Sequence, residues 1–383
     1  MKALNTKWLM RYGLACVATI SLAVFSPFFP SYGQNEANGI SILARYRLPD
    51  IPLATSQQQS GLDGVFNDRG IKLGGLFSDL HHAQGDPDNV FYATADRGPN
   101  GEIKVNGENR RTFPVPEYSP VIYRITAVNN QIELTKGIPI KTQSGEPVTG
   151  LSNTANDEPP YTFDAQTELP LNPNGLDVEG LAHAADGTYW IADEYTPSVA
   201  HIAADGRVLQ RLIPSDMTLD ADTDVRPVLP PIYAKRRNNR GFEGLTISSS
   251  SDRAYVVLQS PLDFPSKEVG RASRMMRLLV IDTAALKPIA EYVYVAEPAS
   301  AFNETKQGEL KLSGVAFVNP TTLLVDERTD PIAHIYQIDL SNATNILGTQ
   351  WDDPNNTEQV LESFTPEQLS ANGITPVSKA LLI

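Results

Sequence analysis

Residues 177–194 read Asp-Val-Glu-Gly-Leu-Ala-His, then Ala-Ala-Asp-Gly, then Thr-Tyr-Trp-Ile-Ala-Asp-Glu, the pattern of a strand, a turn and a second strand. The pair Asp186-Gly187 favours a tight hairpin, because this turn needs residues that tolerate positive φ. A second hairpin follows at 199–213, around the turn Ala204-Asp205-Gly206. Short turns join these strands, so they are predicted to form one antiparallel sheet.

The same strand-turn-strand pattern recurs along the chain, about every 65 to 100 residues. Its other copies begin at Gly75, Phe242 and Leu312. Repeated four-stranded sheets with few helical stretches are typical of the blades of a propeller. The sequence therefore predicts an all-β fold, a β-propeller of four-stranded antiparallel blades. A β-sandwich is the structural alternative, but it would not explain why the pattern returns.

The N-terminus has the features of a signal peptide. Lys2, Lys7 and Arg11 precede an apolar run at 13–24, which is short for a membrane span, and Ser31-Tyr32-Gly33 fits a cleavage site. We predict a signal peptide over residues 1–33 and a propeller domain over 34–383. The mature protein is then secreted or periplasmic, without stable membrane insertion. A retained membrane anchor is the alternative.

Composition narrows the chemistry. Cys16 is the only cysteine and lies in the predicted signal peptide, which excludes cysteine nucleophiles, Cys-ligated zinc and thiol redox chemistry from the mature chain. Without the three basic residues of that segment, 28 Lys and Arg face 45 Asp and Glu, a net charge of −17. This disfavours nucleic acid and anionic membranes as partners and suits cations, above all Ca²⁺. Acidity that only keeps an exported protein soluble would look the same.

Acidic residues recur at two positions of the repeat, at the start of the innermost strand and at the end of the next strand. In an antiparallel hairpin these two positions lie side by side, so the carboxylates are expected at one mouth of the ring. They would repel one another unless a cation or basic groups lay between them. The predicted Ca²⁺ ligands are Asp79, Asp96, Glu179, Glu194, Glu243 and Glu327.

Arginines adjoin these acids at Arg97, Arg240 and Arg328. Because guanidinium groups bind phosphate oxygens bidentately, the mouth suits a small anionic ester. A free carboxylate, Glu179 or Glu243, is a candidate general base. We therefore predict catalytic roles for Glu179, Glu243, Arg97 and Arg240. Alternatively, the carboxylates tie neighbouring blades together by accepting backbone N–H groups or pairing with arginines.

Six segments together resemble the phytase-like domain family, described as having esterase-like activity. The resemblance spans roughly residues 70–345 and implies a β-propeller, export, and hydrolysis of phosphate or carboxylate esters. The matching segments are 95–99 (Ala-Asp-Arg-Gly-Pro), 178–181 (Val-Glu-Gly-Leu), 191–194 (Ile-Ala-Asp-Glu), 239–245 (Asn-Arg-Gly-Phe-Glu-Gly-Leu), 260–262 (Ser-Pro-Leu) and 326–328 (Asp-Glu-Arg).

Two features depart from the family pattern. Gln259 stands where the family has an acid, which removes one charge from the predicted metal site. The resemblance also implies one more blade after Ile383, so we expect five or six blades with the last one incomplete, or completed by residues 40–47.

The leading hypothesis is an exported propeller hydrolase that cleaves phosphate or other esters with the help of calcium. The alternatives are a metal-dependent lactonase-type propeller and a non-catalytic propeller that binds a ligand or an envelope partner.

Overall fold

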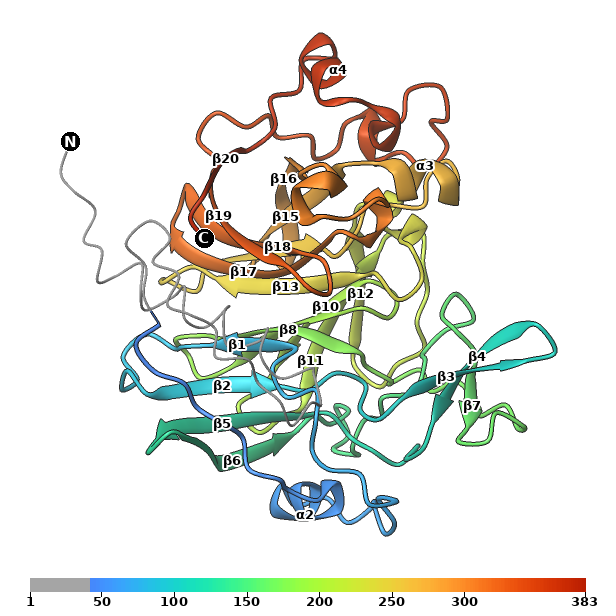
Figure 1. Cartoon of the computed structure of the whole chain (residues 1–383), viewed down its shortest axis with the longest axis vertical. Helices are drawn as coiled ribbons and strands as arrows, with labels where there is room; N and C mark the ends of the chain where they lie inside the picture. The colour runs from blue at the N-terminus through green and yellow to red at the C-terminus, as the bar shows by residue number, and fades with distance from the viewer. Residues whose placement is uncertain (1–41) are drawn as a thin grey trace.

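The computed structural model describes residues 42–383, so the predicted signal peptide lies outside the described residues. Four sheets of four or five strands follow one another along the chain, together with one small three-stranded sheet. The four larger sheets lie face to face in the order of the sequence (Figure 1). Within residues 42–383 no helix is long and apolar enough to cross a membrane.

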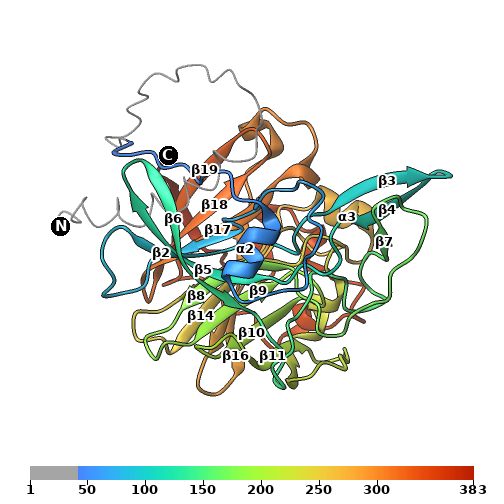
Figure 2. The same cartoon turned by 90° about the horizontal axis from the view of Figure 1, so that it is seen from below.

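The first sheet is covered by the N-terminal segment. Helix α2 (Leu53–Gln59) lies beside this sheet, as Figure 2 shows from below. Its Leu53 belongs to the same buried cluster as Val121 and Tyr123 of the sheet. Arg47 forms an isolated β-bridge with Gln131, on the outer strand of the first sheet. This part of the chain therefore does not complete the last sheet. In order across the sheet, the strands are β1 (Asp79–His81), β2 (Val90–Thr94), β5 (Val121–Val128) and β6 (Gln131–Pro139).

The second and third sheets form the centre of the stack. Strand β13 is buried at every position, because neighbouring sheets cover both of its faces. The second sheet comprises β8 (Val178–His183), β9 (Tyr189–Asp193), β10 (Ser198–Ile202), β11 (Val208–Pro214) and β12 (Asp224–Leu229), of which β12 runs parallel to β11. The third comprises β13 (Phe242–Ile247), β14 (Arg253–Leu258), β15 (Met275–Asp282) and β16 (Lys287–Val295).

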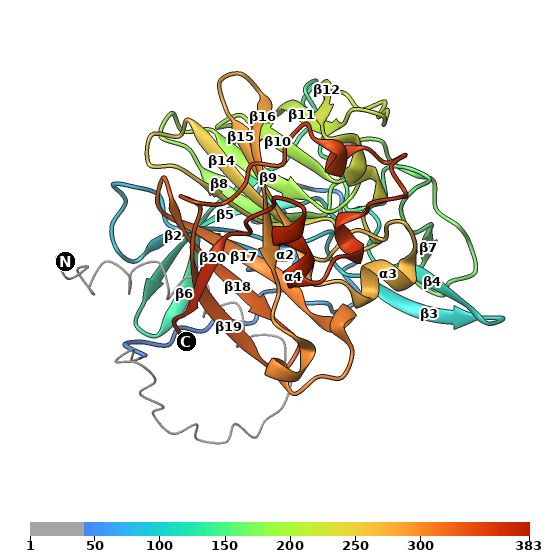
Figure 3. The same cartoon turned by 90° about the horizontal axis from the view of Figure 1, so that it is seen from above.

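The fourth sheet has four strands, contrary to the expectation of an incomplete last blade. They are β17 (Lys311–Asn319), β18 (Thr322–Arg328), β19 (Ala333–Asp339) and β20 (Ser378–Leu381). Before β20, residues 341–377, which we call the strap, lie on the third sheet: Ile346 donates to the Glu291 carbonyl and Val377 to that of Val293, both at 2.9 Å. Figure 3 shows this red segment from above. The predicted count of five or six blades is not confirmed.

The remaining elements lie in the connections. A hairpin of β3 (Gly101–Val105) and β4 (Glu108–Phe113), with β7 (Pro160–Thr162), projects from the body (Figure 1). The short helices are α3 (Lys267–Ala272), α4 (Pro366–Ala371), η2 (Pro231–Lys235), η3 (Ala299–Phe302), η4 (Gln307–Glu309), η5 (Gln350–Asp352) and η6 (Leu361–Ser363).

Three of the innermost strands carry a β-bulge at the same place. The pairing register shifts between Val178 and Gly180, between Phe242 and Gly244, and between Leu312 and Gly314. The residues left outside the pairing are Glu179, Glu243 and Ser313. Because a bulge re-aims the side chain of its extra residue, these three positions are set apart from the inward-outward alternation of their strands.

Glycines let the innermost strands come close together beside the bulges. A Cβ atom on Gly180 would lie 2.8 Å from the Glu243 carbonyl oxygen, and one on Gly244 would lie 2.9 Å from the Gly314 backbone. These positions therefore need glycine for close approach rather than for a turn. As a result, residues at the start of neighbouring innermost strands are held near one another.

Candidate metal centre

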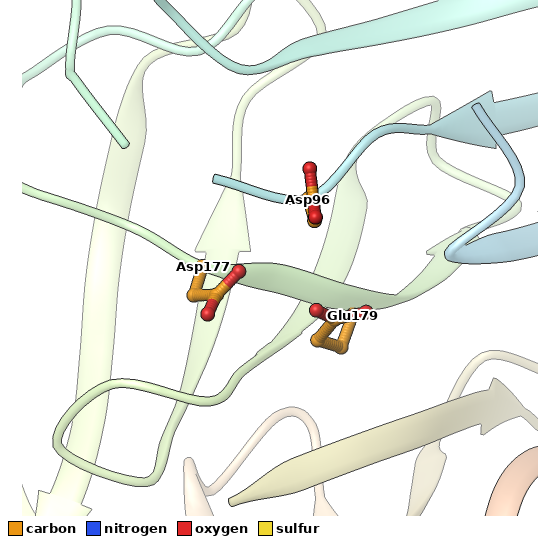
Figure 4. Close-up of side chains that lie close together, drawn as sticks. All are labelled: Asp96, Asp177 and Glu179. Atoms are coloured by element: carbon orange, nitrogen blue, oxygen red, sulfur yellow. The ribbon is translucent and has the colours of Figure 1, made fainter. Parts of the chain in front are cut away.

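Three carboxylates from two sheets converge at the start of the innermost strands, and we call them the axial cluster. Asp96 follows β2, Asp177 precedes β8, and Glu179 is the bulged residue of β8 (Figure 4). One carboxylate oxygen from each residue lies within 4.8 Å of the others. Two of the predicted ligands, Asp96 and Glu179, are thus brought together, with Asp177 as the third.

Glu179 has no counter-charge of its own. Its side chain takes part in no hydrogen bond or ion pair with residues 42–383. Burial, followed by the charges of Glu243, Asp177, Glu194 and Asp96, holds the pKa of Glu179 well above its usual range. A carboxylate surrounded by carboxylates is stable in its charged form only if a cation joins it.

The rest of the axial cluster fits a hard cation. Asp96 accepts the Gly98 N–H at 2.8 Å through one oxygen, and burial followed by the charge of Asp177 raises the pKa of Asp96 to about 7. Asp177 accepts the Arg97 N–H at 3.0 Å. Oxygen ligands from carboxylates are those that Ca²⁺ prefers, and backbone hydrogen bonds orient two of them. The donor set therefore fits a divalent cation.

Arg97 is buried among protein partners, with 6% of its surface exposed. Its guanidinium pairs with Asp177 at 3.0 Å and Glu194 at 3.5 Å, and donates to Asn239 and, at 3.2 Å, to the Tyr195 hydroxyl. These partners occupy the donors that a substrate would need. The predicted catalytic role of Arg97 is therefore replaced by a structural one, in which Arg97, after the first sheet, holds Asp177 and Glu194 beside the second sheet.

Glu194 belongs to this buried network rather than to the axial cluster. Burial, followed by the charge of Asp177, holds the pKa of Glu194 well above its usual range, and Arg97 opposes that rise. Its only ion pair within the described residues is the one with Arg97. It supports the site without completing the group of three.

Glu243 lies on β13, the next innermost strand. It is 5% exposed, and its Oε1 accepts a hydrogen bond from the Ser313 hydroxyl at 3.4 Å. Its Oε2 is buried without a hydrogen-bond partner among the described residues. Burial raises the pKa of Glu243, and the side chain of Gln259 and the charges of Arg328 and Arg240 oppose that rise.

Asp79 ties the first two sheets together. Its two oxygens accept the N–H groups of Leu80 and Leu181, both at 2.8 Å. This is the alternative role that the sequence left open, in which a carboxylate joins neighbouring blades. The structure thus places Asp79 outside the axial cluster.

Glu327 points away from the axial cluster, so its assignment as a metal ligand is wrong. Its oxygens accept from the Tyr294 hydroxyl at 2.6 Å, from Lys379 at 3.0 Å and from the Glu297 N–H at 2.5 Å. Its neighbour Asp326 points to the other face of β18, because successive strand residues alternate.

Sequence reasoning missed Asp326 and Asp177. Asp326 is 3% exposed and its Oδ1 has no hydrogen-bond partner among the described residues. Burial raises the pKa of Asp326 to about 7; Arg328 opposes that rise and Glu243 adds to it. Asp177 carried a usable signal, because it lies two residues before Glu179 in the same repeat.

Arg240 is the predicted catalytic residue with donors to spare. It donates to the Ser260 hydroxyl at 3.1 Å and forms no ion pair within the described part of the chain. A separate surface hollow of about 570 Å³ lies between η2 and η5, and no carboxylate of the axial cluster lines it.

Sheets stacked face to face, with an acidic centre between their innermost strands, define a β-propeller protein with a candidate metal site. A family model described as "Phytase-like: Esterase-like activity of phytase" matches residues 71–382. The chain belongs to this phytase-like family.

The chain is also similar to an uncharacterized secreted protein of Arthroderma benhamiae, with 26% identity over 282 residues that cover 63% of this chain. The chain spans 55% of that relative's length.

Similar solved structures include two propellers and an enzyme. The β-propeller domain of Cps50 (Swd1) from Myceliophteria thermophila has 10% identity and a TM-score of 0.31, over 72% of this chain and 68% of that one. The Dos1 propeller has 10% identity and a TM-score of 0.27, over 68% of this chain and 55% of that one. A luciferin-regenerating enzyme has 10% identity and a TM-score of 0.29, over 68% of this chain and 58% of that one.

Proposed function

We propose that this protein is an exported, calcium-assisted hydrolase of small anionic esters, with phosphate monoesters as the leading class. The observation that carries the proposal is the Glu179 carboxylate, which lies among other carboxylates without a cationic partner. Asp96, Asp177 and Glu179 would hold the cation. The signal-peptide pattern and the relative named as secreted support a place outside the cytoplasm, where Ca²⁺ is abundant.

Each residue of the site then has a defined task. A Ca²⁺ ion held by Asp96, Asp177 and Glu179 would supply positive charge that polarises the ester oxygen and lowers the pKa of water. Glu243 accepts the proton of the attacking water, for which its raised pKa suits it. The new bond joins the water oxygen to the acyl or phosphoryl centre, the bond to the alcohol breaks, and Glu243 returns the proton to the departing alkoxide.

The supporting residues keep these groups in place. Arg97 fixes Asp177 and Glu194 through its buried ion pairs. The Ser313 hydroxyl and the Gln259 side chain hold Glu243 in position. Such preorganisation keeps reacting groups within reach of a bound substrate.

The test uses residues 34–383, assayed with p-nitrophenyl phosphate and p-nitrophenyl acetate in CaCl₂ and then in EDTA. We expect calcium-dependent release of p-nitrophenol. Glu179→Gln should lose both calcium binding and turnover, whereas Glu243→Gln should keep calcium binding and lose turnover by about 10² to 10⁴. Glu133→Gln, at an exposed position of β6, is the matched control.

A folded, calcium-loaded protein that cleaves neither ester would overturn the proposal for these substrates. Lactone hydrolysis under the same conditions would then support the lactonase-type alternative. Calcium binding without any turnover would support a propeller that binds a ligand or an envelope partner.

A further inference from the structure

Equivalent positions of three sheets carry different charges. The bulged residue is Glu179 in the second sheet, Glu243 in the third and Ser313 in the fourth. On the second strand of each hairpin, the residue that pairs with the one just before the bulge is Asp193, Leu258 or Glu327, so these three positions are equivalent. The residues that follow them in the sequence are then equivalent too. Those next residues are Glu194, Gln259 and Arg328.

The charge thus changes in steps across the sheets. The two positions carry two carboxylates in the second sheet, one carboxylate and an amide in the third, and a hydroxyl and a guanidinium in the fourth. Because the folds of the three hairpins are the same, this difference comes from side-chain identity alone. The start of the innermost strands is therefore acidic at one side and basic at the other.

Two arginines, one before β13 of the third sheet and one at the end of β18 of the fourth, lack a strong carboxylate partner. Arg328 donates from Nε to the Ser313 hydroxyl at 2.8 Å, and its nearest carboxylate is the exposed Asp330, at 3.7 Å. Arg240 donates only to Ser260 and forms no ion pair within residues 42–383. Burial and the nearby Arg237 lower the pKa of Arg240, so an anion beside it would stabilise its charged form.

Arg328 is linked to Glu243 through the Ser313 hydroxyl, which accepts from Arg328 at 2.8 Å and donates to Glu243 at 3.4 Å, and Arg240 lies three residues before Glu243 in the chain. The charges of both arginines lower the pKa of Glu243. Neither forms an ion pair with it at 4.0 Å or less, whereas Arg97 is paired with three carboxylates within that limit. Guanidinium groups with spare donors beside a candidate general base are placed to bind the charged part of a substrate.

We propose that Arg240 and Arg328 form an anion subsite, in which the Ser313 hydroxyl orients Arg328 by accepting from its Nε. This subsite selects esters whose acid part carries a negative charge, above all phosphate monoesters. This inference rests on the proposed function, because it describes the substrate of the same site. It also separates the two halves of the site: the first and second sheets contribute cation ligands, and the third and fourth contribute anion ligands.

The experiment is a calorimetric titration of the calcium-loaded chain 34–383 with phenylphosphonate, which resembles a phosphate monoester but cannot be hydrolysed. Arg240→Gln and Arg328→Gln should each weaken binding by about tenfold or more, because each removes a charge-assisted hydrogen bond. Ser313→Ala, a small change that should leave the fold intact, should weaken it by about threefold. The control is Arg253→Gln, an arginine on the exposed end of β14.

Affinities of the three variants within twofold of the wild-type value would overturn the subsite, as would a wild-type protein that does not bind phenylphosphonate. If the arginines only neutralised Glu243, their loss would shift the pH profile of kcat and leave the affinity unchanged, which also contradicts the proposal. Tight binding that the variants weaken, without turnover of any ester, would support the subsite and overturn the hydrolase.

Discussion

Glu179 shows how one uncompensated carboxyl group makes stability depend on pH. Its folded-state pKa is raised above the unfolded value of 4.5, so the folded protein binds more protons than the unfolded chain. The free energy of unfolding therefore falls as the pH rises above about 4.5. Asp96, with its pKa raised to about 7, adds to the same trend.

We expect the calcium-free protein to lose thermal stability between pH 4.5 and pH 8, measured as Tm in EDTA. Calcium at about a hundred times its Kd should restore about 2.7 kcal/mol, with a larger effect at pH 8 than at pH 5, because protons compete with the cation. In Glu179→Gln the pH dependence should be shallower and the calcium effect absent. A Tm in EDTA that is constant or rises across this range would contradict the interpretation.

Arg97 is a second residue whose effect reaches beyond its own contacts. Replacing it with glutamine leaves Asp177 and Glu194 buried without a cation, which should cost about 3–5 kcal/mol of unfolding free energy. Urea denaturation of Arg97→Gln measures this loss. Arg253→Gln, a surface change, should stay within about 0.5 kcal/mol of the wild type, and an equal loss in both variants would rule out a special role for Arg97.

At the scale of strands, the hairpins were predicted well from the sequence, but the face of the strand on which some side chains lie was predicted poorly. The turns at Asp186-Gly187 and Ala204-Gly206 and their flanking strands are confirmed. The bulges are not visible in hydrophobic alternation, because each adds one residue without changing the apolar pattern. Glu327 was placed at the axis for a different reason: the sequence matched it to Glu194, whereas the strand pairing makes Glu327 equivalent to Asp193 and Arg328 equivalent to Glu194.

The adjacent residues Asp326 and Glu327 should therefore respond differently when each loses its charge. Glu327→Gln should lower stability, because it weakens the contacts with Lys379 and the Glu297 N–H, yet keep calcium affinity and the pH profile. Asp326→Asn should keep stability and move the pH profile of kcat/KM, because its carboxyl group lies beside Glu243. The same response from both variants would contradict the assigned facing.

The close approach of innermost strands makes a further prediction at this scale. Gly244→Ala would place a methyl group 2.9 Å from the backbone of Gly314, so we expect a loss of about 1–3 kcal/mol or more. Gly64→Ala is the matched control, because its nearest neighbour would be 3.7 Å away. Chemical denaturation compares the two, and a tolerated Gly244→Ala would mean that the strands separate easily.

For the whole molecule, the repeat predicted stacked sheets, and the family match supports that architecture. The path of the connections between the sheets could not be predicted from the sequence. The strap has no repeat signature and little regular structure, and its place on the third sheet depends on contacts between distant residues, such as Leu369 with Met275 and Val293. Asp177 was missed for a related reason, since its approach to Asp96 depends on how two sheets pack.

The strap should contribute to global stability rather than act as a loose loop. Leu369 is fully buried, and Leu369→Ala should cost about 2–5 kcal/mol, seen as a lower Tm. Limited proteolysis should then cut the strap first. Leu171→Ala, at a position that is 39% exposed, is the control. Cleavage that begins in the first sheet instead would show that the strap does not limit stability.

The repeated bulge also bears on how such a protein can change over generations. Each bulge offers one position that the strand pairing does not use, flanked by a glycine that lets the neighbouring strand approach closely. Glutamate, glutamate and serine occupy the three positions on the same frame. A lineage can therefore exchange the chemistry of the centre one residue at a time while the architecture is inherited unchanged. Relatives that share the fold are then expected to differ in reactivity more readily than in shape.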